Sequence, residues 1–225
     1  MLPMGLLAAI LVIAPQDPTR LDVVYFHDAQ AASEDFTARY LSLRSEDGPI
    51  TPPGKFRLVG ETDDGEVTTR FTLEFVAASA VSYRFSVTRE GHVLARGLAL
   101  AAPEQPGKLL ASGWTGEVEP YGVARYSILD ADTIEGYYIS KMTPEQPGTD
   151  MVSGDTRNGF SGSFTLNSKE VNGRTWGPHE WTLTPRGDIT YLRWREDGRV
   201  ISRGFGIADP QDPRSIVVAY IPVAE

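Results

Sequence analysis

Two stretches of the chain repeat each other: GRVISRGFGIADPQDP at residues 198–213 and GHVLARGLALAAPEQP at residues 91–106. Seven of the sixteen positions are identical (G, V, R, G, A, P and P) at a constant offset of 107 residues. Typical residue usage predicts about one chance match in such a window. We therefore expect an internal duplication, with repeat copies over residues 54–114 and 162–222.

The residues around this repeat predict β-strands. Alternate residues are apolar in the segments 67–75 and 81–87, as expected of half-buried antiparallel strands. Glycine-containing turn pairs such as Asp197-Gly198 separate the strands, and a Pro-x-x-Pro motif connects corresponding strands in the two repeat copies. The predicted fold is all-β, an antiparallel meander of about 11–13 strands that forms a barrel or a sandwich.

Two segments depart from this strand pattern. Residues 29–44 place Phe36, Tyr40 and Leu43 on one helical face, so we expect at most one short helix, at this place. Residues 142–160 are rich in Pro, Gly, Asp and Ser and are predicted to form a long loop.

Composition limits the classes of function. The chain has 225 residues and 41% hydrophobic content, enough for a packed core, and we expect a single β domain over residues 21–225. Its net charge of −9 and its lack of Lys/Arg clusters argue against a nucleic-acid partner. It contains no cysteine, which excludes a disulfide framework, a thiolate nucleophile and a cysteine-based zinc site.

The N-terminus has two interpretations. Residues 1–14 include an apolar run from Gly5 to Ala14 that suits a secretory signal and is too short to span a bilayer, so we expect a secreted or periplasmic bacterial protein without a transmembrane span. No Lys or Arg precedes the run, however, and Pro15 would follow the cleavage site. The alternative is that the segment is another β-strand, because IAPQDPTRLDVVYF resembles the C-terminal IADPQDPRSIVVAYI.

The repeated strand has one slim face and one bulky face. Gly97 and Ala99 in the first copy, and Gly204 and Gly206 in the second, alternate with large residues. Glycine inside a strand costs about 0.5–1 kcal/mol, so a large group is expected to approach the backbone there. That group is either a ligand or an aromatic ring of the core.

Four residues are the candidate ligand-binding positions. Tyr191 and Trp194 lie on the strand before the second repeat, and Arg96 and Arg203 lie on the bulky faces of the two repeats. If these faces point inward, arginine would attract an anionic small molecule. If they point outward, the arginines lie along apolar surface and bind nothing.

His179 and Glu180 form the one pair that suggests acid-base catalysis. Neighbouring residues of a strand point to opposite faces, so the two are not expected to act together. The three histidines lack metal-ligand spacing, and the chain has no nucleophile-elbow, phosphate-loop or dinucleotide-binding motif. We assign no catalytic residue, no metal site and no cofactor.

The stretch TYLRWREDGRVISRGFGIADPQDPRSIVVAYI, residues 190–221, resembles a pattern found in exported bacterial β proteins that have no defined activity. The pattern combines a Tyr/Trp strand, a Gly-x-Gly-Ile strand and a Val-Ala-Tyr strand. The hairpin with Tyr126, Ile128, Gly136 and Tyr138 looks like another element of these proteins. The resemblance covers about a third of the chain and implies a compact, calycin-like barrel.

Three functions remain open. The first is an exported, non-catalytic β-barrel that binds a small ligand or acts as an envelope interaction module with a protein partner. The second is a small enzyme that uses His179, Arg203 and nearby carboxylates as acid-base groups in a barrel cavity. The third is a purely structural surface protein, which a barrel interior filled by side chains would favour.

Overall fold

The computed structural model describes residues 6–13, 17–27, 38–61, 67–101, 109–114, 122–187, 189–209 and 212–223. These residues form sixteen β-strands and no helix. The strands of the first half of the chain are β1 (Leu6–Ile13), β2 (Arg20–His27), β3 (Ala38–Ser45), β4 (Gly54–Glu61), β5 (Val67–Ala77), β6 (Ser82–Arg89), β7 (His92–Ala101) and β8 (Leu109–Trp114). Those of the second half are β9 (Gly122–Ile128), β10 (Thr133–Ser140), β11 (Gly148–Ser153), β12 (Gly162–Lys169), β13 (Thr175–Arg186), β14 (Ile189–Glu196), β15 (Arg199–Asp209) and β16 (Asp212–Pro222).

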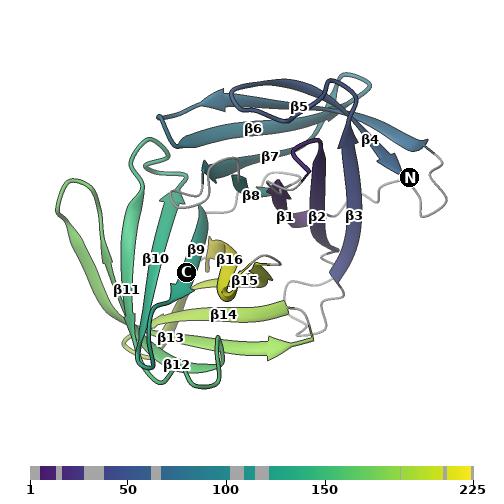
Figure 1. Ribbon diagram of the computed structural model, residues 1–225. Helices are drawn as coiled ribbons and strands as arrows, with labels where there is room; N and C mark the ends of the chain where they lie inside the picture. Colours follow the sequence, from purple (N-terminus) through teal and green to yellow (C-terminus); the bar gives the residue numbers. More distant parts are fainter. Residues whose placement is uncertain are drawn as a thin grey trace. The chain divides into compact units, whose positions relative to one another are not determined.

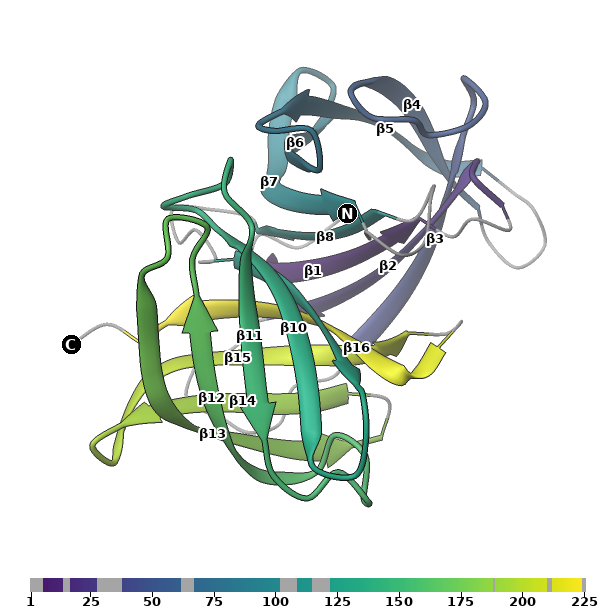
Figure 2. The same cartoon turned by 60° about the vertical axis from the view of Figure 1, so that its left-hand side comes forward.

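The chain divides into two compact units, Met1–Pro120 and Tyr121–Glu225. Each unit is a closed barrel of eight strands, in which consecutive strands pair antiparallel and the last strand pairs with the first (Figure 1). Figure 2 shows the second barrel with its strands in chain order from teal to yellow. The predicted all-β antiparallel meander barrel is therefore confirmed.

The structure differs from the prediction in the number of strands and in the division of the chain into compact units. It has sixteen strands where we expected 11–13, and two compact units where we expected a single domain over residues 21–225. The predicted helix at 29–44 is wrong for its second part, because residues 38–44 belong to β3, which pairs with β2; residues 29–37 lie outside the described residues. The predicted loop 142–160 contains β11, whose six residues are short enough to be hidden by the turn residues around them.

The apolar N-terminal segment is a strand of the first barrel. Residues 6–13 form β1, which pairs with β2 on one side and with β8 on the other. This placement is the one that the strand interpretation of the sequence describes.

The two predicted repeat copies cover the same strands of the two barrels. Residues 54–114 begin at β4 and end with β8, and residues 162–222 begin at β12 and end with β16. Phe56 of β4 pairs with Leu73 of β5, and Phe164 of β12 pairs with Trp181 of β13. Corresponding positions of the two interiors are thereby defined.

Inward-facing side chains fill both barrels. The hydrophobic cluster of the first barrel consists of Leu21, Leu43, Ile50, Phe56, Leu58, Phe71, Leu73, Phe75, Phe85, Ala99, Leu109 and Ala111. The second contains the larger rings Tyr126, Phe164, Trp181 and Trp194 among aliphatic residues.

Aromatic rings lie over glycines of the neighbouring strand. In the first barrel Phe85 is paired with Gly97, which is paired in turn with Gly113 on the next strand. A Cβ built on Gly97 would overlap the Phe85 ring and the Ser112 carbonyl oxygen, and one on Gly113 would lie 2.7 Å from the ring. The slim face of β7 therefore admits a core ring, as one of the two expectations from the sequence had it.

The last strand is buried on both faces, as its apolar sequence predicts. Residues 216–219 of β16 are all 0–1% exposed, although Ile216 and Val218 face the barrel interior and Val217 and Ala219 face outward.

Substituting Gly97→Ala should destabilise the first barrel by about 1–3 kcal/mol, because the new methyl group has no room beside Phe85 and the β8 backbone. Val93→Ala on the same strand is the matched control, since Val93 is 47% exposed and surface changes usually stay within about 0.5 kcal/mol. Urea unfolding followed by far-UV circular dichroism measures both. Equal effects of the two substitutions would contradict the packing described here.

Candidate functional site

A tyrosine, a glycine and an aspartate form a row across three strands inside the second barrel. Tyr126 of β9 pairs with Gly136 of β10, which pairs with Asp150 of β11. The Tyr126 ring occupies the space that a Cβ on Gly136 would need, and its hydroxyl donates a 2.6 Å hydrogen bond to Asp150 Oδ2. Because Gly136 has no side chain, the Tyr126 side chain of β9 crosses β10 and contacts Asp150 on β11.

Asp150 is a buried carboxyl group of the barrel interior. It is 3% exposed, and burial raises its pKa to about 6, a rise that the hydroxyls of Ser168 and Tyr126 partly oppose. The other oxygen, Oδ1, has no hydrogen-bond partner, so Ser168 influences the carboxylate without making a bond of standard geometry to that atom. Burial, followed by the nearby Asp150, raises the pKa of Tyr126 well above its ordinary value.

Two more buried polar atoms of this interior lack hydrogen-bond partners. They are Trp181 Nε1 and His179 Nδ1. His179 pairs with the inward-facing Leu166, and its Nδ1 lies 4.0 Å from Glu196 Oε1, beyond hydrogen-bonding distance. Asp150, Trp181 and His179 therefore offer one acceptor and two ring nitrogens that the surrounding protein does not engage.

Aromatic rings lead from this buried centre to one end of the barrel. The Tyr126 and Trp181 rings are 4.5 Å apart, Trp181 and Trp194 are 5.8 Å apart, and Trp194 and Tyr220 are 5.6 Å apart. Trp181 is fully buried, whereas Trp194 is 7% exposed and Tyr220 is half-buried. The end reached by the series is the one where β12 and β13 are joined, and we call it the barrel mouth.

A hairpin extends the wall at the mouth. Trp176 of β13 pairs with Ser168, which pairs with Asp150, so by register Trp176 continues the inward-facing row. Its ring is 42% exposed, carries the Arg174 guanidinium 3.7 Å from its centroid, and donates a 3.0 Å hydrogen bond from Nε1 to Glu170 Oε1. These two contacts hold an exposed aromatic surface at the rim.

The four predicted ligand-binding residues do not come together. Arg96 belongs to the first unit, where it is exposed on β7. Arg203 is exposed on the outer face of β15, opposite Arg193, and Tyr191 is on the same outer face, with the Arg186 guanidinium 5.5 Å from its ring centroid. Trp194 alone faces the interior of the second barrel. The arginine-lined interior is therefore corrected: the arginines face outward, as the second expectation from the sequence had it.

The residues of the enzyme hypothesis are also separated. His179 faces inward, whereas Glu180 faces outward and pairs with Arg195, whose Nη1 lies 3.2 Å from Glu180 Oε1. Arg203 is on the outer face as well. No pair of acid and base is assembled from these three residues.

The sequence predicted rings near the glycines of β15 but named the wrong residues. Gly204 lies against Tyr220 and Gly206 against Ile216, both from β16, and not against Tyr191 or Trp194. The Tyr126, Gly136 and Asp150 row was missed. The hairpin that contains Tyr126 and Gly136 was recognised in the sequence, and only the strand assignment of Asp150 was lacking.

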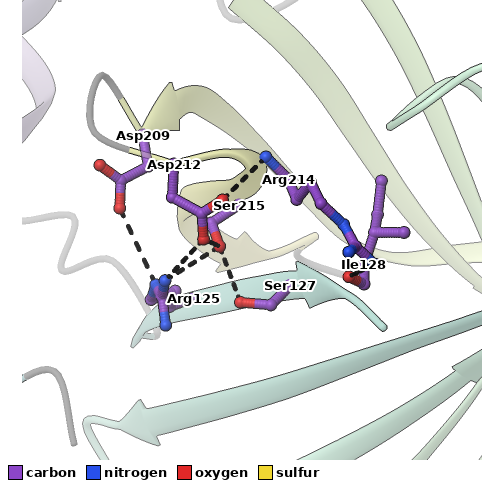
Figure 3. A network of polar contacts seen from close by, with 7 residues as sticks. All are labelled: Arg125, Ser127, Ile128, Asp209, Asp212, Arg214 and Ser215. Carbon is purple, nitrogen blue, oxygen red and sulfur yellow. Dashed lines mark hydrogen bonds and ion pairs between the residues drawn. The ribbon is translucent and has the colours of Figure 1, made fainter. Parts of the chain in front are cut away.

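A second polar cluster lies on the outer face, at the junction of β9, β15 and β16 (Figure 3). Arg125 donates from Nη2 to Ser215 Oγ at 2.9 Å and to Asp212 Oδ2 at 3.2 Å, and its Nε lies 3.9 Å from Asp209 Oδ2. Ser127 and Ser215 are linked at 2.8 Å. Arg125, Asp209 and Ser215 are all buried.

This cluster fastens the closing seam of the barrel. β9 is the first strand and β16 the last, and Arg214 at the start of β16 adds hydrogen bonds of 2.5 and 2.6 Å to the carbonyl oxygens of Ile128 and Leu129. Arg125 forms ion pairs with both aspartates, so its buried charge is compensated although its Nε makes no hydrogen bond. Its contacts join parts of the fold, and we assign it a structural role.

Comparison with family models, with curated proteins and with solved structures found no match. The resemblance to exported bacterial β proteins therefore stays a prediction. Within the described ranges no group of three or more His, Asp or Glu is placed to hold a metal ion, and no helix has the length and hydropathy needed to cross a membrane.

Asp150 makes the stability of the second barrel depend on pH. The carboxyl has a pKa of about 6 in the folded chain and about 3.9 in an unfolded one, so between these values the folded state binds more protons. The free energy of unfolding then falls as the pH rises from 4 to 7, by about 3 kcal/mol for a shift of two units. Asp150→Asn should remove this dependence while it keeps an acceptor for Tyr126.

The measurement is urea unfolding of both proteins at several pH values between 4 and 7, followed by tryptophan fluorescence. The other carboxyls titrate in both proteins, so the difference between the two isolates Asp150. A difference that stays constant over this range would refute the assignment.

Proposed function

We propose that the chain is a non-catalytic binding protein whose second barrel takes a small ligand at its mouth. The ligand lies against inward-facing aromatic rings and above the filled part of the core. The observation that carries the proposal is the aromatic series from Tyr126 to Tyr220, which begins fully buried and ends partly exposed.

The depth of the site follows from burial. Trp181 and Tyr126 are 0% and 1% exposed, so the middle of the barrel is occupied by side chains and offers no room at that level. Tyr138, Ile201 and Tyr220 pack against the core but remain partly exposed towards the mouth. Rings that are packed on one side and open on the other are typical of surfaces that bind flat, apolar groups.

The comparison of the two barrels also supports placing the binding site in the second barrel. Where the first barrel has the pair Leu73 and Val87, the second has Trp181 and Trp194. Of the described cores, the second alone contains a buried carboxyl group. We further propose that the two barrels descend from one eight-stranded unit, with the binding function in the second copy.

A neutral aromatic probe tests the mouth. N-phenyl-1-naphthylamine should gain fluorescence with the native protein, and Trp194→Ala should weaken its binding roughly tenfold through loss of one large ring contact. Tyr191→Ala is the matched control, because that ring is on the outer face of the same strand, and it should leave the affinity unchanged.

A second variant separates binding from folding. Trp194→Ala leaves a large cavity and costs about 3–5 kcal/mol. Ser202→Phe adds a ring opposite Trp194 instead and should block the mouth without emptying the core. If the probe binds Ser202→Phe as well as the native protein, or if Tyr191→Ala abolishes binding, the mouth is not the site; absence of binding to the native protein would leave the purely structural role.

We also propose export of the protein, on the basis of the apolar run at residues 5–14. Cleavage after Ala14 would remove β1, one of the eight strands that close the first barrel. The proposal predicts that the chain isolated from the outer compartments of its host lacks the first fourteen residues. An intact mass that includes Met1 would contradict a cleaved signal.

A further inference from the structure

The unengaged oxygen of Asp150 indicates the charge of the ligand. A carboxylate held out of water is stable only when it is paired or hydrogen-bonded, and Oδ1 has no such partner in the described protein. Tyr126 donates a hydrogen bond to the other oxygen, and the nearby Ser168 hydroxyl also favours the ionised form of the group. A donor from outside the chain would complete the hydrogen bonding of this group.

Among the described residues, no lysine or arginine side chain points into the interior of the second barrel. The lysines and arginines of the described part of the second unit lie on the outer face or in turns, and Arg125, the buried one, faces outward into its own ion cluster. The described interior therefore lacks the arginine lining that would attract an anion. With a net charge of −9, the whole chain also favours the approach of cations.

The aromatic surroundings fit the same kind of ligand. Tyr138 and Tyr220 each lie near enough to Tyr126 to interact electrostatically with it, and Tyr126 hydrogen-bonds to Asp150. Ring faces attract organic cations, most strongly where water is excluded. A carboxylate beneath several rings therefore combines both elements of ammonium recognition.

One ring lies between Asp150 and the mouth. Tyr138 is paired with Gly148, which is two residues from Asp150 on the same face of β11 and nearer the mouth. The ring occupies the space of the missing Gly148 side chain. Tyr138 therefore covers the mouth side of Asp150, and access of a ligand to the carboxyl group requires this ring to move away from Gly148.

We infer that the mouth of the second barrel binds an organic ammonium ion, with an N–H group that donates to Asp150 Oδ1 and an apolar part that lies on Tyr138, Trp194 and Tyr220. The inference rests on the proposed function, and it adds the chemical class of the ligand. The Tyr138 ring rotates off Gly148 when the ammonium group enters.

Three small probes with one benzyl group and different charges test this inference: benzylammonium, benzyl alcohol and phenylacetate. Binding to the full chain at pH 7.5 is measured by isothermal titration calorimetry. Benzylammonium should bind at least tenfold more tightly than either of the others. Asp150→Asn should reduce its affinity to that of benzyl alcohol.

The control is Glu180→Gln, which removes one negative charge from the outer face of the same barrel and should leave the affinity for benzylammonium unchanged. Equal binding of benzylammonium to native protein and to Asp150→Asn would overturn the inference. Tighter binding of phenylacetate would overturn it as well.

The outcomes distinguish this inference from the proposal on which it rests. If benzyl alcohol binds as tightly as benzylammonium and Ser202→Phe abolishes both, the mouth binds small ligands but the ammonium inference is wrong. If no probe binds the native protein, both fail. Circular dichroism of Asp150→Asn confirms that the variant is folded before its affinity is interpreted.

Discussion

A ring lying over the glycine of the next strand is the contact on which both barrels depend. Phe85 lies over Gly97 in the first, and Tyr126 lies over Gly136 in the second. An eight-stranded barrel is just wide enough to be filled by side chains. Rings that stood upright on every strand would collide near the axis. A glycine opposite lets the ring lie flat against the wall and reach the second strand along, so that the barrel closes without a void.

The same geometry has different results in the two units. Phe85 reaches Gly113, another glycine, and the described first core stays apolar. The Tyr126 ring also extends to the second strand along, and its hydroxyl donates a hydrogen bond to Asp150 on that strand. The Phe85 contact in the first barrel is packing alone. The hydroxyl oxygen of Tyr126 adds a hydrogen bond to a buried carboxyl group in the second barrel. Function in such a fold can change through the interior positions while the strand order stays the same.

The sequence predicted the fold through periodicity and repetition, and it predicted the site only in part. The alternation of residues 67–75 and the match at an offset of 107 residues are local signals, so strand type and the common plan of β4–β8 and β12–β16 followed from them. Which side chains point into a closed barrel depends on strand pairing, which local sequence does not determine. Whether Arg203 faces in or out depends on which residue of β14 it pairs with, and Arg193 on the outer face settled this against an arginine-lined interior. Asp150 was missed because β11 has only six residues between turn-rich segments.

Stability alone does not explain Asp150. Replacing a buried ionised group by an apolar one of similar size is often neutral or stabilising, and the described core of the first barrel shows that this strand order folds without a buried carboxyl group. An ion cluster such as that of Arg125 compensates its own charges through contacts between strands. Asp150 has one hydrogen bond and one unengaged oxygen, so compensation within the chain is incomplete. The proposed ammonium ligand would supply the donor that this half-satisfied group lacks in the protein.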